Sequence, residues 1–204
     1  MSGYIGINLK EMIEQIGEVE TKSILSDFSC PLNPDVENFL KTNAIEFAKQ
    51  GISSTYLVMA SYQKKYVLVG YFTLANKFFC VDRDAFPSKR LRSRIAKFAQ
   101  FDSTLKRYIL SAPLIGQIGK NYSNSYNQLI SGNELLKLAL DKVHELQSII
   151  GGKIVYLECE DKPRLLEFYS NNGFVNFGKR YLDRDETDLS GDYLIQMLKY
   201  MNWK

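Results

Sequence analysis

One part of the sequence constrains the fold more than any other: a well-capped helix followed at once by a buried strand. Ser131 and Glu134 form an S-x-x-E capping box directly before the apolar run "LLKLALDKVHELQSII". Gly151 and Gly152 end that helix, and "KIVYLECE" follows as a continuous run of β-branched and aromatic residues, typical of a central strand. Because the strand "YILSAPLIGQIGK" precedes the helix, the two strands should be parallel, with a right-handed crossover.

The remaining periodicities predict further strands and helices on both sides of this unit. A short helix is expected over residues 8–17 and a longer one over 34–50, where Asn33 caps the start and Gly51 follows the end. A third helix opens at Pro163 and closes at Gly173. Strands are expected at residues 21–28, 53–62, 66–81, 174–182 and 193–200, with an acidic loop at 183–192. The predicted fold class is α/β: a central mixed β-sheet of about six to seven strands flanked by helices.

Composition limits the function classes. The 204 residues are 45% hydrophobic and 24% charged, which favours a single domain spanning residues 1–204. The three cysteines, Cys30, Cys80 and Cys159, are far apart, and His144 is the only histidine, so a disulfide framework, a zinc site and a Ser-His-Asp triad are not expected. No signal segment and no run of roughly 18 apolar residues is present. We therefore expect a cytoplasmic protein with no metal and no membrane association.

The net charge of +3 is mild, but basic residues gather in one segment. Residues 84–108 are predicted to form a basic helical insertion, and Lys89–Arg107 contains seven basic residues and one acid. Two interpretations remain open for this segment: a solvated helix face, or a patch that binds phosphate or RNA. The four residues proposed for the RNA contact are Lys89, Arg90, Arg92 and Arg94.

A polar loop, residues 121–130, leads directly into the N-terminus of the capped helix. Free backbone N–H groups and the positive end of the helix dipole suit an anion such as pyrophosphate, and Lys120 at the start of the loop adds charge. Every strand-loop-helix connection shares these features, so this pattern by itself is weak evidence for a ligand.

The order of these segments resembles the GNAT superfamily of N-acetyltransferases. "APLIGQIGK" is similar to the family's central strand, "NQLISG" stands where the family has its Q/R-x-x-G-x-G/A pyrophosphate loop, and "KIVYLECED" is similar to the strand after it. "PRLLEFYSNNGF" resembles the closing helix, with its Tyr and its Gly-Phe. The N-terminal half, including "FLKTNAIEFAKQGISSTYLVMA", is similar to the toxin-type branch, so the resemblance covers roughly residues 20–200.

The resemblance implies a sheet splayed between its fourth and fifth strands, with acetyl-CoA as co-substrate. A backbone N–H near Ile118 or Gly119 would stabilise the oxyanion. Two positions depart from the family pattern, since Asn127 replaces Gln/Arg and Ile130 replaces the first glycine. Because Ile130 cannot easily adopt a positive φ, the local backbone must differ. The residues implied in CoA binding are Gln117, Ile118, Gly119, Lys120, Asn127, Gln128, Ile130, Ser131, Gly132 and Asn133.

Tyr169 is the residue to which the resemblance assigns protonation of the departing CoA thiolate. A phenol titrates near ~10 and a thiol near ~8.5, so a tyrosine remains protonated at neutral pH and can donate. The alternative is a core-packing phenol whose hydroxyl is bonded to a backbone carbonyl. For the general base, Glu158, Glu160, Asp82 and Asp84 are candidates, and solvated carboxylates at strand ends are the alternative explanation for all four.

Three functions follow from these observations. The first is an acetyl-CoA-dependent N-acetyltransferase that acts on an unidentified amine acceptor. The second is a toxin-type enzyme that acetylates aminoacyl-tRNA, suggested by the basic segment and the N-terminal resemblance. The third, suggested by the altered loop, is a non-catalytic module that binds acyl-CoA or a protein partner. The sequence does not determine the oligomeric state, and a homodimer is compatible with it.

Overall fold

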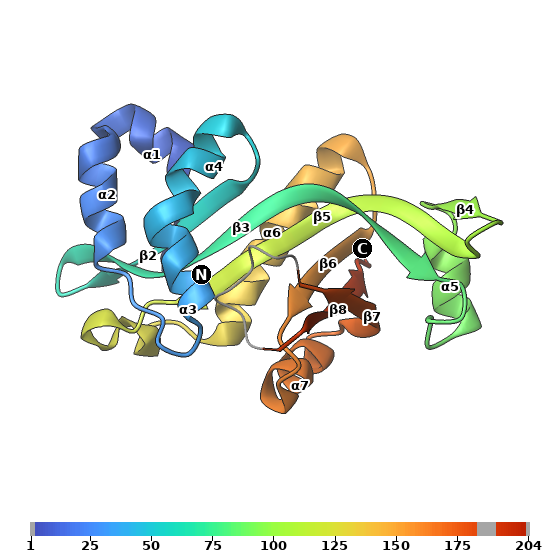
Figure 1. Cartoon of the computed structure of the whole chain (residues 1–204). Helices are drawn as coiled ribbons and strands as arrows, with labels where there is room; N and C mark the ends of the chain where they lie inside the picture. The colour runs from blue at the N-terminus through green and yellow to red at the C-terminus, as the bar shows by residue number, and fades with distance from the viewer. Residues whose placement is uncertain (1–2, 183–190, 203–204) are drawn as a thin grey trace. The chain divides into compact units, whose positions relative to one another are not determined.

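A computed structural model describes residues 3–182 and 191–202 (Figure 1), so most of the predicted acidic loop at 183–192 lies outside the described residues. The chain divides into two compact units. Unit 1 comprises Met1–Ala75 and Gly116–Lys142, and unit 2 comprises Asn76–Ile115 and Val143–Lys204. Each unit is described by itself below.

The strands form one mixed sheet of eight strands, ordered β1-β2-β3-β5-β6-β8-β7, with β4 paired to β5. Only the β5–β6 ladder is parallel among the pairings described here. The α/β class with a mixed sheet flanked by helices is therefore confirmed, with eight strands where about six to seven were expected. The strands are β1 Tyr4–Asn8, β2 Ser54–Tyr62, β3 Lys65–Asp82, β4 Gln100–Asp102, β5 Arg107–Lys120, β6 Ile154–Cys159, β7 Val175–Tyr181 and β8 Tyr193–Tyr200.

The helices largely follow the predicted caps. Asn8 accepts hydrogen bonds from the first turn of α1, and Asn33 Oδ1 accepts one from Val36 N at 3.3 Å in α3. Gly51 and Gly173 have φ values of 70° and 82°, as helix-ending glycines require. The helices are α1 Leu9–Ile16, α2 Glu18–Ser26, α3 Pro34–Asn38, the π-helical η1 Phe39–Asn43, α4 Ala44–Gln50, α5 Lys89–Ile95, the 3-10 helix η2 Ser123–Gln128, α6 Gly132–Ile150 and α7 Pro163–Asn171.

The prediction of a strand at residues 21–28 is wrong, because this segment forms most of α2. Thr21 and Leu25 lie one helical turn apart, and both are buried. Thr21 Oγ1 also donates to Gly17 O at 2.7 Å, which ties the helix to the glycine at its start. Burial at i and i+4 within unit 1 therefore overrides the weak alternation that suggested a strand.

Strand β1 was not predicted. It pairs antiparallel with β2 along its whole length, from Tyr4 opposite Ala60 to Asn8 opposite Tyr56. Its sequence, "YIGIN", is short and contains Gly6, which weakens any strand signal. The hydrogen-bonding edge of β2, rather than the local sequence, makes these residues extended.

Residues 84–108 are only partly helical. Helix α5 stops at Ile95, and β4 then forms an antiparallel ladder with β5, where Phe101 faces Tyr108. Asp102 Oδ1 accepts hydrogen bonds from Thr104 N at 2.8 Å and Leu105 N at 3.0 Å, so its side chain shapes the turn between these strands. The predicted basic helical insertion is therefore a short helix followed by a hairpin.

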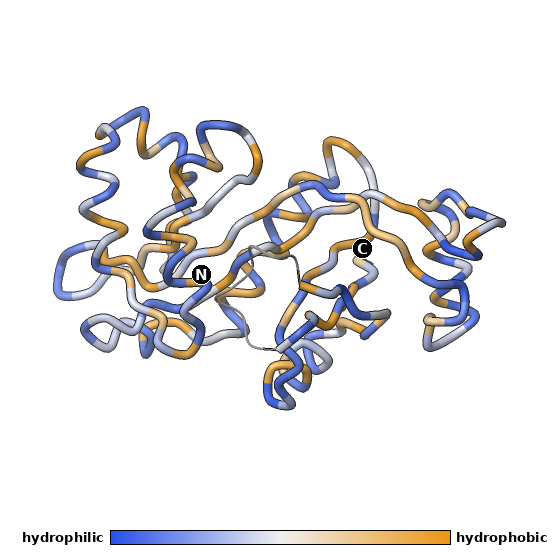
Figure 2. Tube along the Cα trace, in the orientation of Figure 1, coloured by the Kyte–Doolittle hydropathy of each residue, from blue (hydrophilic) through white to orange (hydrophobic). Residues whose placement is uncertain are grey.

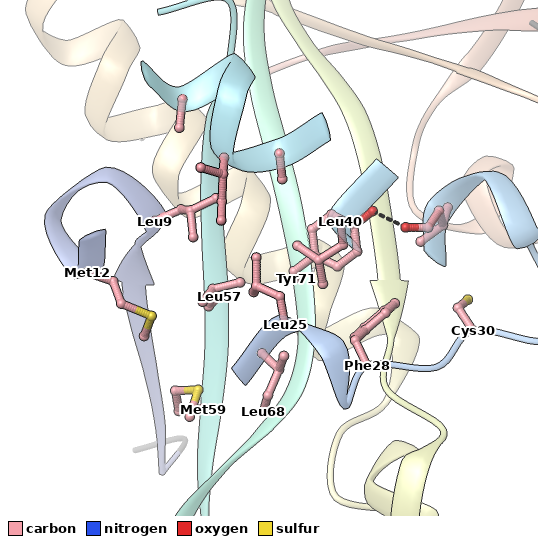
Figure 3. Packing of buried hydrophobic residues seen from close by; sticks show 14 residues of the cluster. Leu9, Met12, Leu25, Phe28, Cys30, Leu40, Leu57, Met59, Leu68 and Tyr71 are labelled. Carbon is pink, nitrogen blue, oxygen red and sulfur yellow. Dashed lines mark hydrogen bonds between the residues drawn. The ribbon is translucent and has the colours of Figure 1, made fainter. Parts of the chain in front are cut away.

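Each unit has its own core. In unit 1, α1, α2 and the segment of α3 to α4 pack on β2 and β3, and Figure 3 shows Phe28, Leu40 and Tyr71 among the side chains that meet there. Tyr71 Oη donates to Val36 O at 2.5 Å, drawn dashed in Figure 3. Figure 2 shows hydrophobic and hydrophilic residues alternating along the helices of unit 1, as expected for helices with one buried face. Unit 2 is centred on Phe79, Tyr156 and Phe177.

Candidate functional site

The β5–β6 ladder is very short. It contains two pairs, Leu114 with Tyr156 and Ile115 with Leu157, although β5 itself runs for 14 residues. In the strand order, β5 is the fourth strand and β6 the fifth. This is the pair for which the resemblance predicts a splay. From Gly116 onward β5 belongs to unit 1, whereas β6 belongs to unit 2.

The end of β5 carries four of the predicted CoA-binding residues, all in unit 1. The Gln117 backbone N–H donates to Thr73 Oγ1 at 2.8 Å, and Gln117 Nε2 donates to Asp35 Oδ2 at 2.7 Å. Gly119 lies so close to α3 that an added Cβ would be 2.5 Å from Val36 Cγ1. Gln117 is thus engaged within the protein, and the oxyanion role of the Ile118 or Gly119 N–H stays a prediction.

The loop after β5 departs from a glycine-rich loop, as expected. Ile130 is 2% exposed and is not among the residues with positive φ. The left-handed positions are instead Asn124 and Ser125, with φ values of 50° and 61° inside η2. Asparagine tolerates this conformation better than most residues, so the loop turns without glycine. Lys120 Nζ donates to Asn127 O at 3.0 Å and thereby ties the start of the loop to its far side.

The predicted capping box is present at the start of α6. Ser131 N and Ser131 Oγ donate to Glu134 Oε2 at 2.8 and 2.7 Å, and Glu134 N donates to Ser131 Oγ at 3.2 Å. The bond from the Ser131 backbone holds the pKa of Glu134 below its ordinary value. An anion at this helix start would therefore meet a carboxylate, while Gly132 is half-buried and Gln128 and Asn133 are exposed.

Asn121 is a residue that sequence analysis missed. It is 1% exposed, and its side chain joins three segments of unit 1. Asn121 Oδ1 accepts from Ser29 N and from Ser123 N, each at 3.0 Å, and Asn121 Nδ2 donates to Leu68 O at 2.9 Å. The only hint in the sequence was an amide residue immediately after a predicted strand, at the start of the candidate loop.

Tyr169 lies in unit 2, in the last turn of α7, and is 5% exposed. Its ring contacts Phe168 and Phe174, with centroids 5.1 and 5.7 Å apart. Within residues 3–182 and 191–202 no hydrogen bond reaches its hydroxyl, so the carbonyl partner expected of a purely core-packing phenol is absent there. Burial, and then the nearby Cys159, raise the pKa of Tyr169, which keeps the phenol protonated.

The base candidates are largely engaged in ion pairs. Glu158 Oε2 lies 2.6 Å from Arg180 Nε, and Glu158 Oε1 accepts from Gln196 Nε2 at 2.8 Å. Glu160 pairs with Lys162 at 2.6 Å, and Asp82 pairs with Arg107 at 2.6 Å. A proton arriving at Glu158 would have to displace one of these bonds, so its contacts favour a structural role over that of a general base. Asp84 is exposed at a turn.

Unit 2 also contains a cavity of about 640 Å³ that the sequence did not reveal. Phe79, Tyr156 and Phe177 supply its apolar side chains, and Glu158 with Arg180 supplies an ion pair on its wall. Side chains alternate across β6, so Glu158 faces the cavity whereas Cys159, near Tyr169, points to the other face. The cavity draws on strands far apart in sequence, which explains why no local pattern announces it.

The four basic residues proposed for RNA lie on α5, in unit 2. Lys89 and Arg90 are exposed, whereas Arg92 and Arg94 are partly buried. The Arg94 guanidinium lies 5.1 Å from the centre of the Tyr200 ring, a cation–π contact that holds it against the sheet. Lys89 and Arg90 are therefore the more available of the four for a phosphate.

Neither a metal cluster nor a membrane helix is found in the part of the chain that the structure describes. No group of three His, Cys, Asp or Glu side chains there is arranged to hold a metal ion. Among the same residues, no helix combines the length and apolar character needed to cross a bilayer.

Comparison with known proteins gives the fold. The sequence matches no family model and no curated protein. Its structure is similar to AtaT complexed with acetyl-methionyl-tRNAfMet, at 18% identity and a TM-score of 0.60, covering 94% of this chain and 93% of AtaT. It is also similar to a Tyr-to-Phe variant of KacT, at 16% identity and a TM-score of 0.61, covering 95% and 94%. AtaTR bound with acetyl-CoA matches at 15% identity and a TM-score of 0.55, covering 96% and 93%. The chain has the GNAT fold.

Proposed function

We propose that this chain is an acetyl-CoA-dependent N-acetyltransferase in which an acceptor amine attacks the thioester directly. The observation that carries the proposal is Tyr169, a buried phenol on the closing helix of a GNAT fold, with a hydroxyl that no described residue engages. Among the described residues, the buried polar side-chain atoms without a partner are Ser53 Oγ and Thr55 Oγ1, so the Tyr169 hydroxyl oxygen has no partner but is not fully enclosed by protein. A hydroxyl that is available to a bound reactant explains why no described residue hydrogen-bonds it.

The reaction requires one proton transfer from the Tyr169 hydroxyl to the leaving sulfur. As the neutral amine nitrogen bonds to the acetyl carbon, the nitrogen gives up a proton to water, the carbon–sulfur bond breaks and the sulfur leaves as a thiolate. Tyr169 donates its proton to that sulfur and regains one from solvent. Burial raises the pKa of the phenol, which makes it a weaker acid, and the same apolar surroundings would also raise the pKa of the thiol that receives the proton.

The CoA-binding residues remain the predicted ones, at the end of β5, in loop 121–130 and at the start of α6. Backbone N–H groups at Gly132 and the α6 dipole would face the pyrophosphate. Glu134 is the feature that opposes this assignment, because its carboxylate already occupies the Ser131 N–H. AtaTR bound with acetyl-CoA is a GNAT-fold precedent for this co-substrate, which supports its use here.

The cavity of unit 2 is our candidate for the acceptor. Its apolar side chains from Phe79, Tyr156 and Phe177 would hold the body of the acceptor. Lys77, Arg107, Lys179 and Arg180 outnumber Asp82 and Glu158 on the cavity wall, so the cavity favours an acceptor that carries an anionic group beside its neutral amine.

Acetyl-CoA is expected to stabilise the protein against heat. At a concentration a hundredfold above Kd, binding to the folded state alone adds about 2.7 kcal/mol, which corresponds to a rise in Tm of about 5 °C or more for a chain of this size. Differential scanning fluorimetry measures the shift, and isothermal titration calorimetry gives Kd. ATP serves as the control for a non-specific effect of a charged nucleotide. If acetyl-CoA gives neither heat nor a shift, the enzyme proposal is wrong and the partner-binding module is favoured.

A second candidate, acetylation of aminoacyl-tRNA, is motivated by the exposed basic residues of α5. Lys89 and Arg90 extend from a short helix in the β3–β5 connection of unit 2. AtaT, similar in fold, has been captured with acetyl-methionyl-tRNAfMet. Two exposed cations close together would each neutralise one RNA phosphate.

Binding of a bulk tRNA sample should therefore weaken steeply with salt. For the double variant Lys89→Gln/Arg90→Gln, the slope of log K against log salt should fall by about 2 relative to the unmodified chain. Filter binding at several salt concentrations measures both slopes. The matched control is Lys10→Gln, an exposed lysine of unit 1. Equal slopes for the two variants, or no binding by the unmodified chain, would dismiss the RNA-directed function.

A further inference from the structure

Loop 121–130 is held at its start by one buried side chain. Asn121 continues from β5, and its own backbone N–H donates to Val69 O at 2.8 Å. Its side-chain oxygen accepts from Ser29 N and Ser123 N, and its side-chain nitrogen donates to Leu68 O. The amide thus joins β3, the segment after α2 and the loop itself, all within unit 1.

Further hydrogen bonds hold the rest of the loop in this one conformation. The next residue, Tyr122, donates its N–H to Ser29 O at 2.7 Å. Tyr4 Oη donates to Leu129 O at 2.8 Å, and Lys120 Nζ donates to Asn127 O at 3.0 Å. The left-handed turn at Asn124 and Ser125 lies between these attachments. Side chains therefore impose on this loop a shape that a glycine-rich loop would reach through backbone freedom.

We propose that Asn121 is the positioning residue that presets loop 121–130 to receive the pyrophosphate of CoA; this inference rests on the proposed function. Asn121 lies under the loop and does not itself contact the ligand. By fixing Ser123 N and Ser29 N, it sets the path of the chain that leads to Ser131 and Gly132. The ligand then meets a loop that is already shaped, and binding does not have to order it.

The geometry requires an asparagine at this position. The side-chain oxygen satisfies two backbone N–H groups, and the nitrogen satisfies one carbonyl. Alanine would leave Ser29 N, Ser123 N and Leu68 O without these partners in a buried place. Aspartate keeps both accepting bonds but cannot, while ionised, donate to Leu68 O. Alanine therefore removes all three side-chain hydrogen bonds, whereas aspartate removes only the one donated to Leu68 O.

The experiment compares acetyl-CoA with acetyl-pantetheine, which lacks the pyrophosphate. If Asn121→Ala reduces the competent loop population to about a tenth, Kd and KM for acetyl-CoA rise about tenfold. The value of kcat at saturating acetyl-CoA should stay within about twofold, because the loop acts on binding. The Kd for acetyl-pantetheine should change little, so the preference for acetyl-CoA over acetyl-pantetheine, measured by calorimetry as the ratio of the two Kd values, falls about tenfold.

A matched control separates positioning from general destabilisation. Thr21 is also fully buried in unit 1, and Thr21→Val removes its bond to Gly17 O at 2.7 Å. Both variants should lower Tm, but only Asn121→Ala should change the acetyl-CoA to acetyl-pantetheine preference. If the alanine variant does not fold, Asn121→Asp, which retains both accepting bonds, is tested in the same way and should show a smaller fall.

The outcomes are distinguishable. If the unmodified chain does not bind acetyl-CoA, the proposed function fails and this inference fails with it. If the unmodified chain binds acetyl-CoA and the Asn121 variants show an unchanged preference, only the positioning role is overturned. An equal loss for both thioesters would likewise overturn it, because the effect would not involve the pyrophosphate.

Discussion

Replacing Tyr169 with phenylalanine is expected to lower kcat at least about a hundredfold, which is the lower end of what a positioned general acid contributes. The substitution removes only the hydroxyl and leaves the ring against Phe168 and Phe174. Without a proton donor in this apolar environment, the thiolate would have to leave unprotonated. A thiol-reactive dye that detects released CoA measures turnover once an accepted amine has been found.

The same substitution should leave the CoA Kd and the Tm almost unchanged. No described residue hydrogen-bonds the hydroxyl, so little native interaction is lost. Tyr71→Phe is the matched control, because it removes a buried hydroxyl that donates to Val36 O. This control should lower stability and spare kcat. If Tyr169→Phe turned over at the rate of the unmodified enzyme, the acid role would be wrong and core packing would explain the residue.

Gly119→Ala should destabilise the fold by about 1 to 3 kcal/mol, the usual cost of an overpacked site. A methyl group at Gly119 would lie 2.5 Å from Val36 Cγ1 and 3.6 Å from both Cys30 Sγ and Phe28 Cζ. Val36 Cγ1 supplies the overlap, while Cys30 and Phe28 are at ordinary contact distance and leave the methyl no room on that side. Urea unfolding followed by circular dichroism measures the change in the free energy of unfolding.

Two comparisons sharpen this test. Gly6→Ala in β1 has nothing within 4 Å of its added Cβ and should change stability by less than about 0.5 kcal/mol. Combining Gly119→Ala with Val36→Ala should cost less than the sum of the two single changes, because the smaller side chain makes room for the methyl. An additive result would show that Gly119 and Val36 are not in close contact in solution.

Helix ends were the features most readily predicted. Ser131 and Glu134 form the expected capping box, Asn33 caps α3, and Gly173 ends α7 in the left-handed conformation. Such signals depend on residues three or four positions apart, so the interactions they describe lie within the predicted segment. The hairpin of β2 and β3 was predicted for the same reason, although Gln63 and Lys64 adopt positive φ in its turn.

Segments whose conformation depends on contacts with distant residues were predicted less well. Residues 21–28 form a helix because Thr21 and Leu25 share a buried face, and residues 4–8 form a strand because β2 offers a free edge. Their local patterns were ambiguous or weak. In both cases a surface contributed by distant residues decides the conformation, and that surface does not exist until the chain has folded.

Some features of the candidate site could likewise be predicted from the sequence, and others could not. From the sequence alone came the order of strand, loop, helix, strand and closing helix, and with it Tyr169, because helical periodicity and caps are local properties. Only the tertiary structure revealed the buried amide of Asn121, the cavity around Phe79, and the phenol hydroxyl that no described residue engages. Those features arise where segments dozens of residues apart come into hydrogen-bonding or van der Waals contact. Such contacts depend on how the sheet brings its strands together, which the local sequence does not encode.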